Sequence, residues 1–294
     1  MISLRKILLF VLGLGLLGAA LYAAAGGVDK AAGGQLASAP GIPATAINDA
    51  GNFIFGAPPG DGFEEEVAKY EPIAEHLSRV TGKRFVYRYS ADWLSYSKNM
   101  AGGVYDVVFD GPAFTGWRID RMSHTPLVKL PDDVVFVVIT RADGGIGQLK
   151  HLAGHRVCTV APPDVGALAL LSQFNNPARQ PMIVEAKSWQ EAHKGLMDGK
   201  CTASIMSQRN LETIESETVK VVYRYRPLPN YAFSAGPRIA PEMKGKIRDA
   251  LLSVSGKTAT AKLRASHGAG DFVPATPAEY AGLGRLLKDS LYYQ

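Results

Sequence analysis

The chain lacks the motifs that mark most metal, nucleotide and hydrolase sites. Its six histidines are scattered, and no HxxH, HExxH or CxxC pattern occurs, which excludes the common zinc-binding spacings. Neither GxxxxGKS nor GxxxxGKT is present, and GxSxG is absent, so no phosphate-binding loop and no nucleophile elbow are indicated. We therefore expect a protein that is not an enzyme and that uses no cofactor or metal.

Clustered positive charge is also missing. The formal net charge is +5, from 32 Lys and Arg against 27 Asp and Glu, and acidic residues interrupt the basic ones almost everywhere. Nucleic-acid binding would call for a basic patch or stripe. We therefore expect no nucleic-acid partner.

The N-terminal segment decides the compartment. Arg5 and Lys6 precede an apolar run over residues 7–25 that ends in LYAAAGG. This order is typical of a secretory signal peptide, and about 20 apolar residues also suffice to span a bilayer. Residues 1–25 are predicted to be a cleaved signal peptide, which we favour, or an inner-membrane anchor. Either way the body is periplasmic and contacts the membrane only through this segment. Residues 26–47, rich in Gly, Ala, Ser and Pro, are predicted to be a flexible linker.

Cysteine is scarce, with only Cys158 and Cys201 present. An even count in an oxidising compartment permits one disulfide. Both residues lie in or beside predicted strands that could be parallel neighbours. A disulfide is favoured, and two buried thiols are the alternative.

Strands and helices alternate from Phe53 to Phe114, and the alternation begins again near Arg156. Such alternation predicts mostly parallel sheets flanked by helices. The predicted fold class is α/β with two lobes joined by two hinge crossovers. The predicted first lobe is discontinuous and comprises residues 48–142 and 232–294, whereas the second comprises residues 143–231.

The order of motifs resembles a known family. FGAPP, a helix, a strand, a helix and YDVVFDGPAF are followed by HRVCTVAPPDVGALALL and GKCTASIM. From about Asn52 to Tyr280 this order is similar to the phosphate, phosphite and phosphonate substrate-binding proteins of ABC transporters. The resemblance implies a type 2 periplasmic binding protein that closes on its ligand and passes it to a membrane permease.

One loop departs from the family pattern. Family members that hold phosphonates usually have a loop rich in Ser and Thr before the first helix of the second lobe, where a helix N-terminus favours an oxyanion. The matching loop here is Ala161-Pro162-Pro163-Asp164. Both prolines lack an N–H group, and Asp164 is expected to be an N-cap. We expect a weakly acidic pocket that prefers a cation or a polar neutral molecule.

Ligands in open α/β sheets bind outside the carboxyl ends of the strands. Asp110 is either a ligand-binding carboxylate or a turn aspartate that bonds its own backbone. Tyr89 either stacks on a ligand or packs in the core, and the loop around Gly60 is either a ligand contact or a plain turn. The candidate ligand-binding residues are Pro58, Gly60, Asp61, Tyr89, Ser90, Asp110, Phe114, Pro163, Asp164, Gly166, Ser207, Gln208 and Tyr231.

The predicted function is that of an exported solute-binding protein. It would capture a small polar ligand in a cleft between the lobes for an ABC-type importer. The alternative keeps the fold but changes the role to a membrane-tethered sensor or accessory domain of a signalling system, which would pass ligand occupancy to a partner protein.

Overall fold

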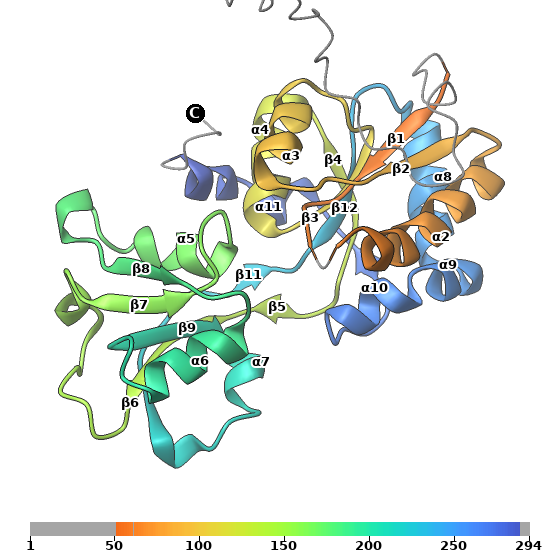
Figure 1. The fold of residues 1–294 in the computed structure, drawn as a ribbon. Coiled ribbons are helices and arrows are strands. Elements are labelled where there is room, and N and C mark those ends of the chain that lie inside the picture. The colour runs from red at the N-terminus through yellow and green to blue at the C-terminus, as the bar shows by residue number, and fades with distance from the viewer. Residues whose placement is uncertain (1–50, 61, 289–294) are drawn as a thin grey trace, which may run out of the picture. The chain divides into compact units, whose positions relative to one another are not determined.

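The structure is a computed structural model that describes residues 51–60 and 62–288. These residues belong to one compact unit with two mixed β-sheets, each flanked by helices, and a small two-stranded sheet that joins them (Figure 1). The predicted signal peptide or anchor and the predicted linker lie outside the described residues. Among the residues that are described, no helix combines the length and the apolar character that a membrane span needs.

The first sheet has the strand order β13-β4-β12-β3-β1-β2. Strands β2, β1 and β3 are parallel, as the strand–helix alternation predicts, whereas β12, β4 and β13 each pair antiparallel with a neighbour. The strands are β1 (Phe53–Gly56), β2 (Phe85–Arg88), β3 (Val107–Asp110), β4 (Thr125–Lys129), β12 (Ala232–Ala235) and β13 (Val273–Pro274).

Alternating side chains place helices on both faces of this sheet. Phe55 and Phe109 belong to one buried cluster with α2, α8 and α10, whereas Ile54 and Val108 belong to another with α3, α4 and α11. Because successive side chains of a strand point to opposite faces, both faces of the sheet are covered by helices. The lobe therefore has three layers, with the sheet between two layers of helices. The helices are α2 (Phe63–Thr81), α3 (Trp93–Ala101), α4 (Pro112–Met122), α8 (Pro241–Leu252), α9 (Val254–Ala259), α10 (Ala261–Ser266) and α11 (Pro277–Tyr280), with a 3-10 turn η5 (Leu283–Leu287).

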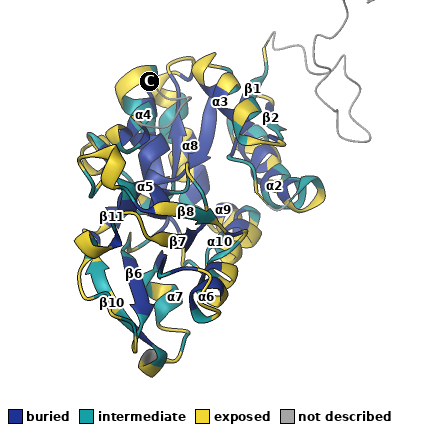
Figure 2. Ribbon diagram, turned by 60° about the vertical axis from the view of Figure 1, so that its left-hand side comes forward, coloured by how far each residue is buried: buried dark blue, intermediate teal, exposed yellow. Residues whose placement is uncertain are grey.

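The second sheet has the order β10-β6-β9-β7-β8. Strands β8, β7 and β9 are parallel, and β6 and β10 are antiparallel additions. Figure 2 shows β6 of this sheet buried, whereas β10 at the edge of the sheet is partly exposed. The strands are β6 (Phe136–Arg141), β7 (Arg156–Thr159), β8 (Met182–Glu185), β9 (Ala203–Ser207) and β10 (Val219–Arg224).

The helices of the second lobe begin where the sequence has capping residues. Ser188 accepts a hydrogen bond from the Glu191 N–H, as the capping-box spacing predicts, and the Glu191 carboxylate accepts from the Lys187 N–H. The helical elements are α5 (Val165–Leu171), α6 (Trp189–Met197) and α7 (Gln208–Leu211), with 3-10 turns η2 (Leu149–Leu152), η3 (Pro177–Arg179) and η4 (Ser216–Thr218).

Two crossovers connect the lobes through β5 (Asp133–Val134) and β11 (Leu228–Pro229), which pair antiparallel. This corrects the predicted first boundary at residue 142, because β6 pairs with β9 and β10 and therefore belongs to the second sheet. A β-branched strand does not reveal which sheet it joins, since its pairing partners lie far away in the sequence. After the return crossing, β12 begins at Ala232.

Cys158 and Cys201 form the disulfide that the sequence favoured. Cys158 lies in β7, and Cys201 lies just before β9, the parallel neighbour of β7. The two Cα atoms are 5.7 Å apart, and both side chains are buried beside Ala186 and Ala192. The disulfide therefore closes a loop of 43 positions within the second lobe.

Alkylation of the protein in denaturant without reductant is expected to modify neither cysteine, because both are held in the disulfide. The double variant Cys158→Ala with Cys201→Ala is expected to lower the free energy of unfolding by about 4 kcal/mol, because the loop no longer restricts the unfolded chain. Denaturant unfolding measures this change, with reduced wild-type protein as the control. Two alkylated thiols in the untreated protein would contradict the disulfide.

Candidate functional site

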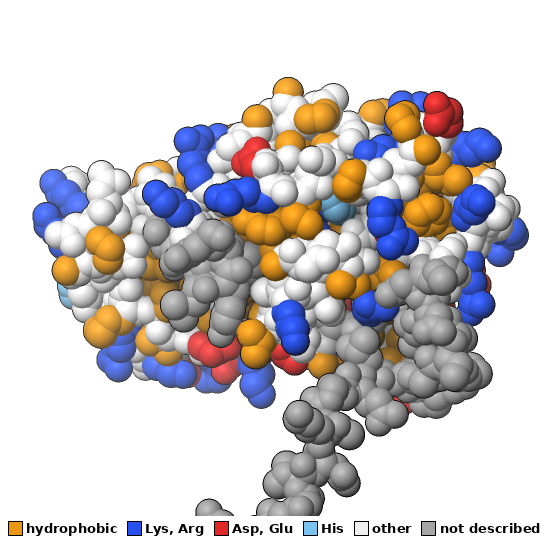
Figure 3. Space-filling view, turned by 90° about the horizontal axis from the view of Figure 1, so that it is seen from above, with side chains coloured by type: hydrophobic (Ala, Val, Ile, Leu, Met, Phe, Trp, Pro, Cys, Tyr) orange, Lys and Arg blue, Asp and Glu red, His pale blue; other side chains and the backbone are white. Residues whose placement is uncertain are grey.

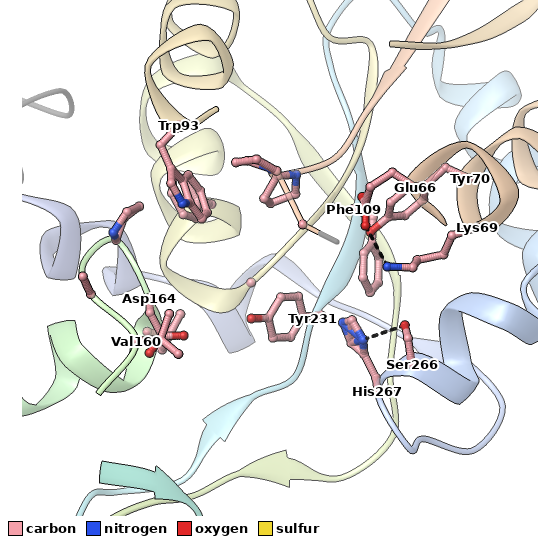
Figure 4. Close-up of a pocket in the computed structure, with 18 residues that line it drawn as sticks. Glu66, Lys69, Tyr70, Trp93, Phe109, Val160, Asp164, Tyr231, Ser266 and His267 are labelled. Atoms are coloured by element: carbon pink, nitrogen blue, oxygen red, sulfur yellow. Dashed lines mark hydrogen bonds and ion pairs between the residues drawn. The ribbon is translucent and has the colours of Figure 1, made fainter. Parts of the chain in front are cut away.

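Two adjoining cavities lie where the carboxyl ends of the strands of both lobes face one another. The inner cavity has a volume of about 250 Å³ and takes residues from both lobes (Figure 4). The outer cavity, about 700 Å³, is lined by the first crossover, by the start of α7 and by residues that follow α10. Both cavities share Asp164, Tyr231, Ser266 and His267.

The first turns of α2 supply the charged wall of the inner cavity. Glu66 is only 1% exposed, and its Oε1 lies 2.8 Å from Nζ of Lys69. Tyr70 follows on the same helix and also lines the cavity. Sequence reasoning missed these three residues because it considered only strand-end loops. The signal was available, since α2 starts directly after the loop that follows β1, and a Glu and a Lys three positions apart share one face of a helix.

Aromatic rings cover much of the cavity wall. Trp93 stacks on Phe114 with ring centroids 5.6 Å apart and planes 9° apart. On the other side Tyr231 stacks on Phe109 at 5.8 Å, and the His267 ring meets Tyr231 edge-on at 4.9 Å. Figure 4 shows Tyr231 and Phe109 lying between the Asp164 end and the end that Glu66 and Lys69 form. A flat or cationic group fits such a wall, because ring faces attract positive charge.

The loop before α5 lines the inner cavity through Ala161, Pro163 and Asp164. Asp164 is the N-cap of α5, and its Oδ1 accepts hydrogen bonds from the N–H groups of Gly166 at 2.8 Å and Ala167 at 3.3 Å. The bond between Pro162 and Pro163 is cis. Burial raises the pKa of Asp164 from 3.8 to about 6, although the two backbone hydrogen bonds oppose this. The Asp164 carboxylate therefore takes the amides that an oxyanion would use.

Two further titratable groups in the cavity, His267 and Tyr231, are neutral near pH 7. Burial, together with the positive charge of Lys69, lowers the pKa of His267 from 6.5 to about 4. Burial raises the pKa of the Tyr231 hydroxyl, and Asp164 and Asp110 raise it further. His267 and Tyr231 thus offer neutral hydrogen-bonding groups.

The structure brings eight of the predicted site residues to these two cavities. Six line the inner cavity, and two line the outer cavity alone. They are Pro58, Gly60, Phe114, Pro163, Asp164 and Tyr231 in the inner cavity, and Ser207 and Gln208 in the outer cavity. Asp61 lies outside the described residues.

Four predicted residues line neither cavity. The Tyr89 ring meets Phe63 edge-on at 5.2 Å, and the Ser90 hydroxyl lies 3.0 Å from the Tyr105 hydroxyl. The Gly166 N–H is used by Asp164. These residues serve local structure here, because a position near a strand end does not fix where the side chain points.

The fourth residue is Asp110. Its position matches neither a ligand-binding carboxylate nor a turn aspartate that bonds its own backbone. Its carboxylate is fully buried, accepts from Nε of Arg118 at 2.5 Å and accepts from the Tyr96 hydroxyl. Arg118 also donates to the Tyr96 hydroxyl at 2.9 Å. This network ties β3 to α3 and α4 and so supports the wall that carries Trp93 and Phe114.

The fold and the inter-lobe cavities define a two-lobed periplasmic binding protein. Residues 55–280 match the family described as ABC transporter, phosphonate, periplasmic substrate-binding protein, and the chain belongs to this family. The members of the family are substrate-binding proteins, not enzymes. The phosphate-import protein PhnD of Mycolicibacterium smegmatis is 28% identical over 152 residues, which are 49% of this chain and 44% of that protein. The chain thus matches less than half the length of that relative.

Solved structures share the fold at low sequence identity. A protein from Xanthomonas citri bound to ATP has a TM-score of 0.66 at 13% identity, over 82% of this chain and 99% of that one. PhnD1 from Prochlorococcus marinus in complex with methylphosphonate has a TM-score of 0.61 at 11% identity, over 81% and 97%. The binding-protein component of an ABC phosphonate transporter from Pseudomonas aeruginosa has a TM-score of 0.58 at 13% identity, over 80% and 85%.

Arg118→Ala is expected to lower the free energy of unfolding by about 3–5 kcal/mol, because it leaves the buried Asp110 carboxylate without its cation. Urea unfolding near neutral pH measures the change. Arg121→Ala removes the same charge from an exposed position of the same helix and is the matched control. Equal stability of the two variants would contradict a buried ion pair.

Asp164→Asn keeps an N-cap oxygen but cannot ionise. Since the folded-state pKa of Asp164 lies above its usual value, its contribution to stability is present below about pH 4 and is lost as the pH rises through about 6. Asp164→Asn is therefore expected to gain stability relative to wild type between about pH 4 and about pH 7, by at most about 3 kcal/mol. Urea unfolding across this range tests it, and a pH-independent difference would contradict the raised pKa.

Proposed function

We propose that this chain is the exported solute-binding component of an ABC importer, and that it binds a small organic cation or polar neutral molecule in preference to free phosphate. Family membership supports the role of a binding protein. The preference for a cation or a polar neutral molecule over phosphate is inferred from the residues that line the inner cavity.

The observation that carries the proposal is the occupied N-terminus of α5. In the family such a position suits an oxyanion, because unpaired N–H groups and the helix dipole both favour negative charge. Here the Asp164 carboxylate already accepts from Gly166 and Ala167, and Pro162 and Pro163 have no N–H to donate. A phosphate at this position would meet a carboxylate instead of free donors.

The charged residues of the cavity wall also favour a cation over phosphate. Among the described residues that line the inner cavity, Lys69 carries the positive charge, and it is paired with Glu66. Asp164 adds a second carboxylate, and the lowered pKa of His267 keeps that ring neutral near pH 7. An ammonium or alkylammonium group between Trp93 and Tyr231 would gain cation–π attraction of about 0.5–2 kcal/mol.

A ligand of this kind fits the role of an importer component. A cavity of about 250 Å³ suits a small molecule, and a permease would receive the ligand after the lobes open. Lys and Arg side chains are dispersed over the face seen in Figure 3. The family match does not favour the alternative role of a membrane-tethered sensor.

A thermal-shift screen tests the ligand class. Choline and tetramethylammonium are expected to raise the melting temperature, because a ligand that binds only the folded state stabilises it, whereas phosphate and methylphosphonate are expected to have little effect. Trp93→Ala is expected to weaken binding of the cations by about 1–2 kcal/mol in calorimetry. Leu94→Ala, an exposed position of the same helix that does not line the cavity, is the matched control.

A variant of Asp164 tests directly whether this carboxylate disfavours phosphate. Asp164→Ser keeps a capping oxygen and removes the negative charge, so it is expected to bind phosphate more tightly than the wild-type protein does. Tight binding of phosphate or methylphosphonate by the wild-type protein would overturn the proposed ligand preference and leave the importer role intact.

A further inference from the structure

A hydrogen-bonded contact joins the two lobes at the outer cavity, which the first crossover also lines. Arg209 lies in the first turn of α7, directly after β9 of the second lobe. Its Nη1 donates to the carbonyl oxygen of His267 at 3.2 Å and also to that of Gly268, both in the first lobe. The partners are 58 and 59 positions apart, so only the approach of the lobes brings them together.

The acceptor segment is the C-terminal end of α10. His267 is the C-cap residue of this helix, and Gly268 has φ 55°, in the left-handed region that favours glycine. Carbonyl groups at a helix C-terminus lack partners within the helix and suit a guanidinium donor. A Cβ atom on Gly268 would lie 3.2 Å from Nη1 of Arg209, so the glycine leaves room for the side chain.

The same segment forms one wall of the binding cavity. The His267 ring lies edge-on to Tyr231 and 5.4 Å from the ring of Phe109, and Ser266 lines both cavities. Arg209 holds the backbone of this wall from the opposite lobe. The position of α7 and the position of the His267 ring are therefore linked.

The start of α7 fixes where the Arg209 side chain begins. Ser207 caps the helix by accepting from the Asn210 N–H at 3.2 Å, and the Gln208 side-chain oxygen accepts from Nη1 of Arg224. Arg209 itself is exposed. Its bonds can therefore be exchanged for bonds to water at small net cost.

The lobes also meet on the side of α5, where the contact is apolar. Leu168 and Ala169 of α5 belong to the same buried cluster as Tyr280 and Leu283 of the first lobe. Separating these side chains would expose apolar surface to water, which is unfavourable. The polar, exposed contact of Arg209 is thus the one that can break while the apolar contact remains.

We propose that Arg209 is a positioning residue that latches the second lobe to the His267 segment and so holds the cavity wall in place. When its two hydrogen bonds form, α7 and α10 are held together over the cavities. When they break, the cleft opens on this side and the solute exchanges. The proposal rests on the proposed function, since a latch serves a protein that takes up and releases a solute between its lobes.

Distance measurement between spin labels tests the latch without any ligand. Labels on Lys194→Cys in α6 and Val254→Cys in α9 report on the separation of the two lobes, and both positions are well exposed. Arg209→Ala is expected to shift the distance distribution to longer values and to broaden it. Arg209→Lys, which keeps the charge but not the planar group with several donors, is expected to give an intermediate distribution.

Arg179→Ala serves as the matched control, because Arg179 is an exposed arginine of the second lobe that does not line either cavity. It is expected to leave the distances unchanged. Hydrogen exchange of residues 265–270 is expected to be faster in Arg209→Ala than in the control. Distances and exchange in Arg209→Ala that match those of Arg179→Ala would overturn the latch. This result would leave the proposed ligand preference unaffected, because the thermal-shift screen tests that preference separately.

Discussion

The binding site depends on the pairing of β5 with β11, the two short strands that carry the chain from one sheet to the other and back. Backbone hydrogen bonds between these strands hold the crossovers side by side, so the carboxyl ends of the parallel strands of both lobes face the same space. Tyr231 lies two residues after β11 and lines both cavities, which places one wall of the site beside the hinge. A hinge of paired strands permits small relative motion of the lobes while keeping their facing edges in register.

Within that space the Asp164 carboxylate occupies the N-terminus of α5. An unoccupied helix N-terminus attracts anions because its N–H groups have no partners. Asp164 supplies those partners from within the chain, and burial keeps its pKa high enough that it ionises only above about pH 6. The same side chain stabilises α5 and sets the charge of the cavity. The capping of α5 and the proposed ligand preference therefore depend on the same side chain.

A buried hydrogen-bond network supports the aromatic residues of the cavity wall. Trp93 and Phe114 are held by α3 and α4, and these helices are tied to β3 by the Asp110 carboxylate, Arg118 and Tyr96. A buried charge pair of this kind adds little net stability but is costly to break. It fixes the two helices to one strand and so limits the orientations that the cavity-facing rings adopt.

The sequence by itself determined the α/β class, the two sheets and the N-cap role of Asp164, because helix periodicity, strand alternation and capping are local. It favoured the disulfide of the second lobe but left two buried thiols as the alternative, and the structure decided between them. It also identified the loops at Pro58 and Pro163, since chain topology fixes strand ends. Only the tertiary structure decided that β6 joins the second sheet, that Asp110 pairs with Arg118, and that Glu66, Lys69 and His267 line the cavity. Those outcomes depend on which residues meet across large separations in sequence, and no local pattern encodes that choice.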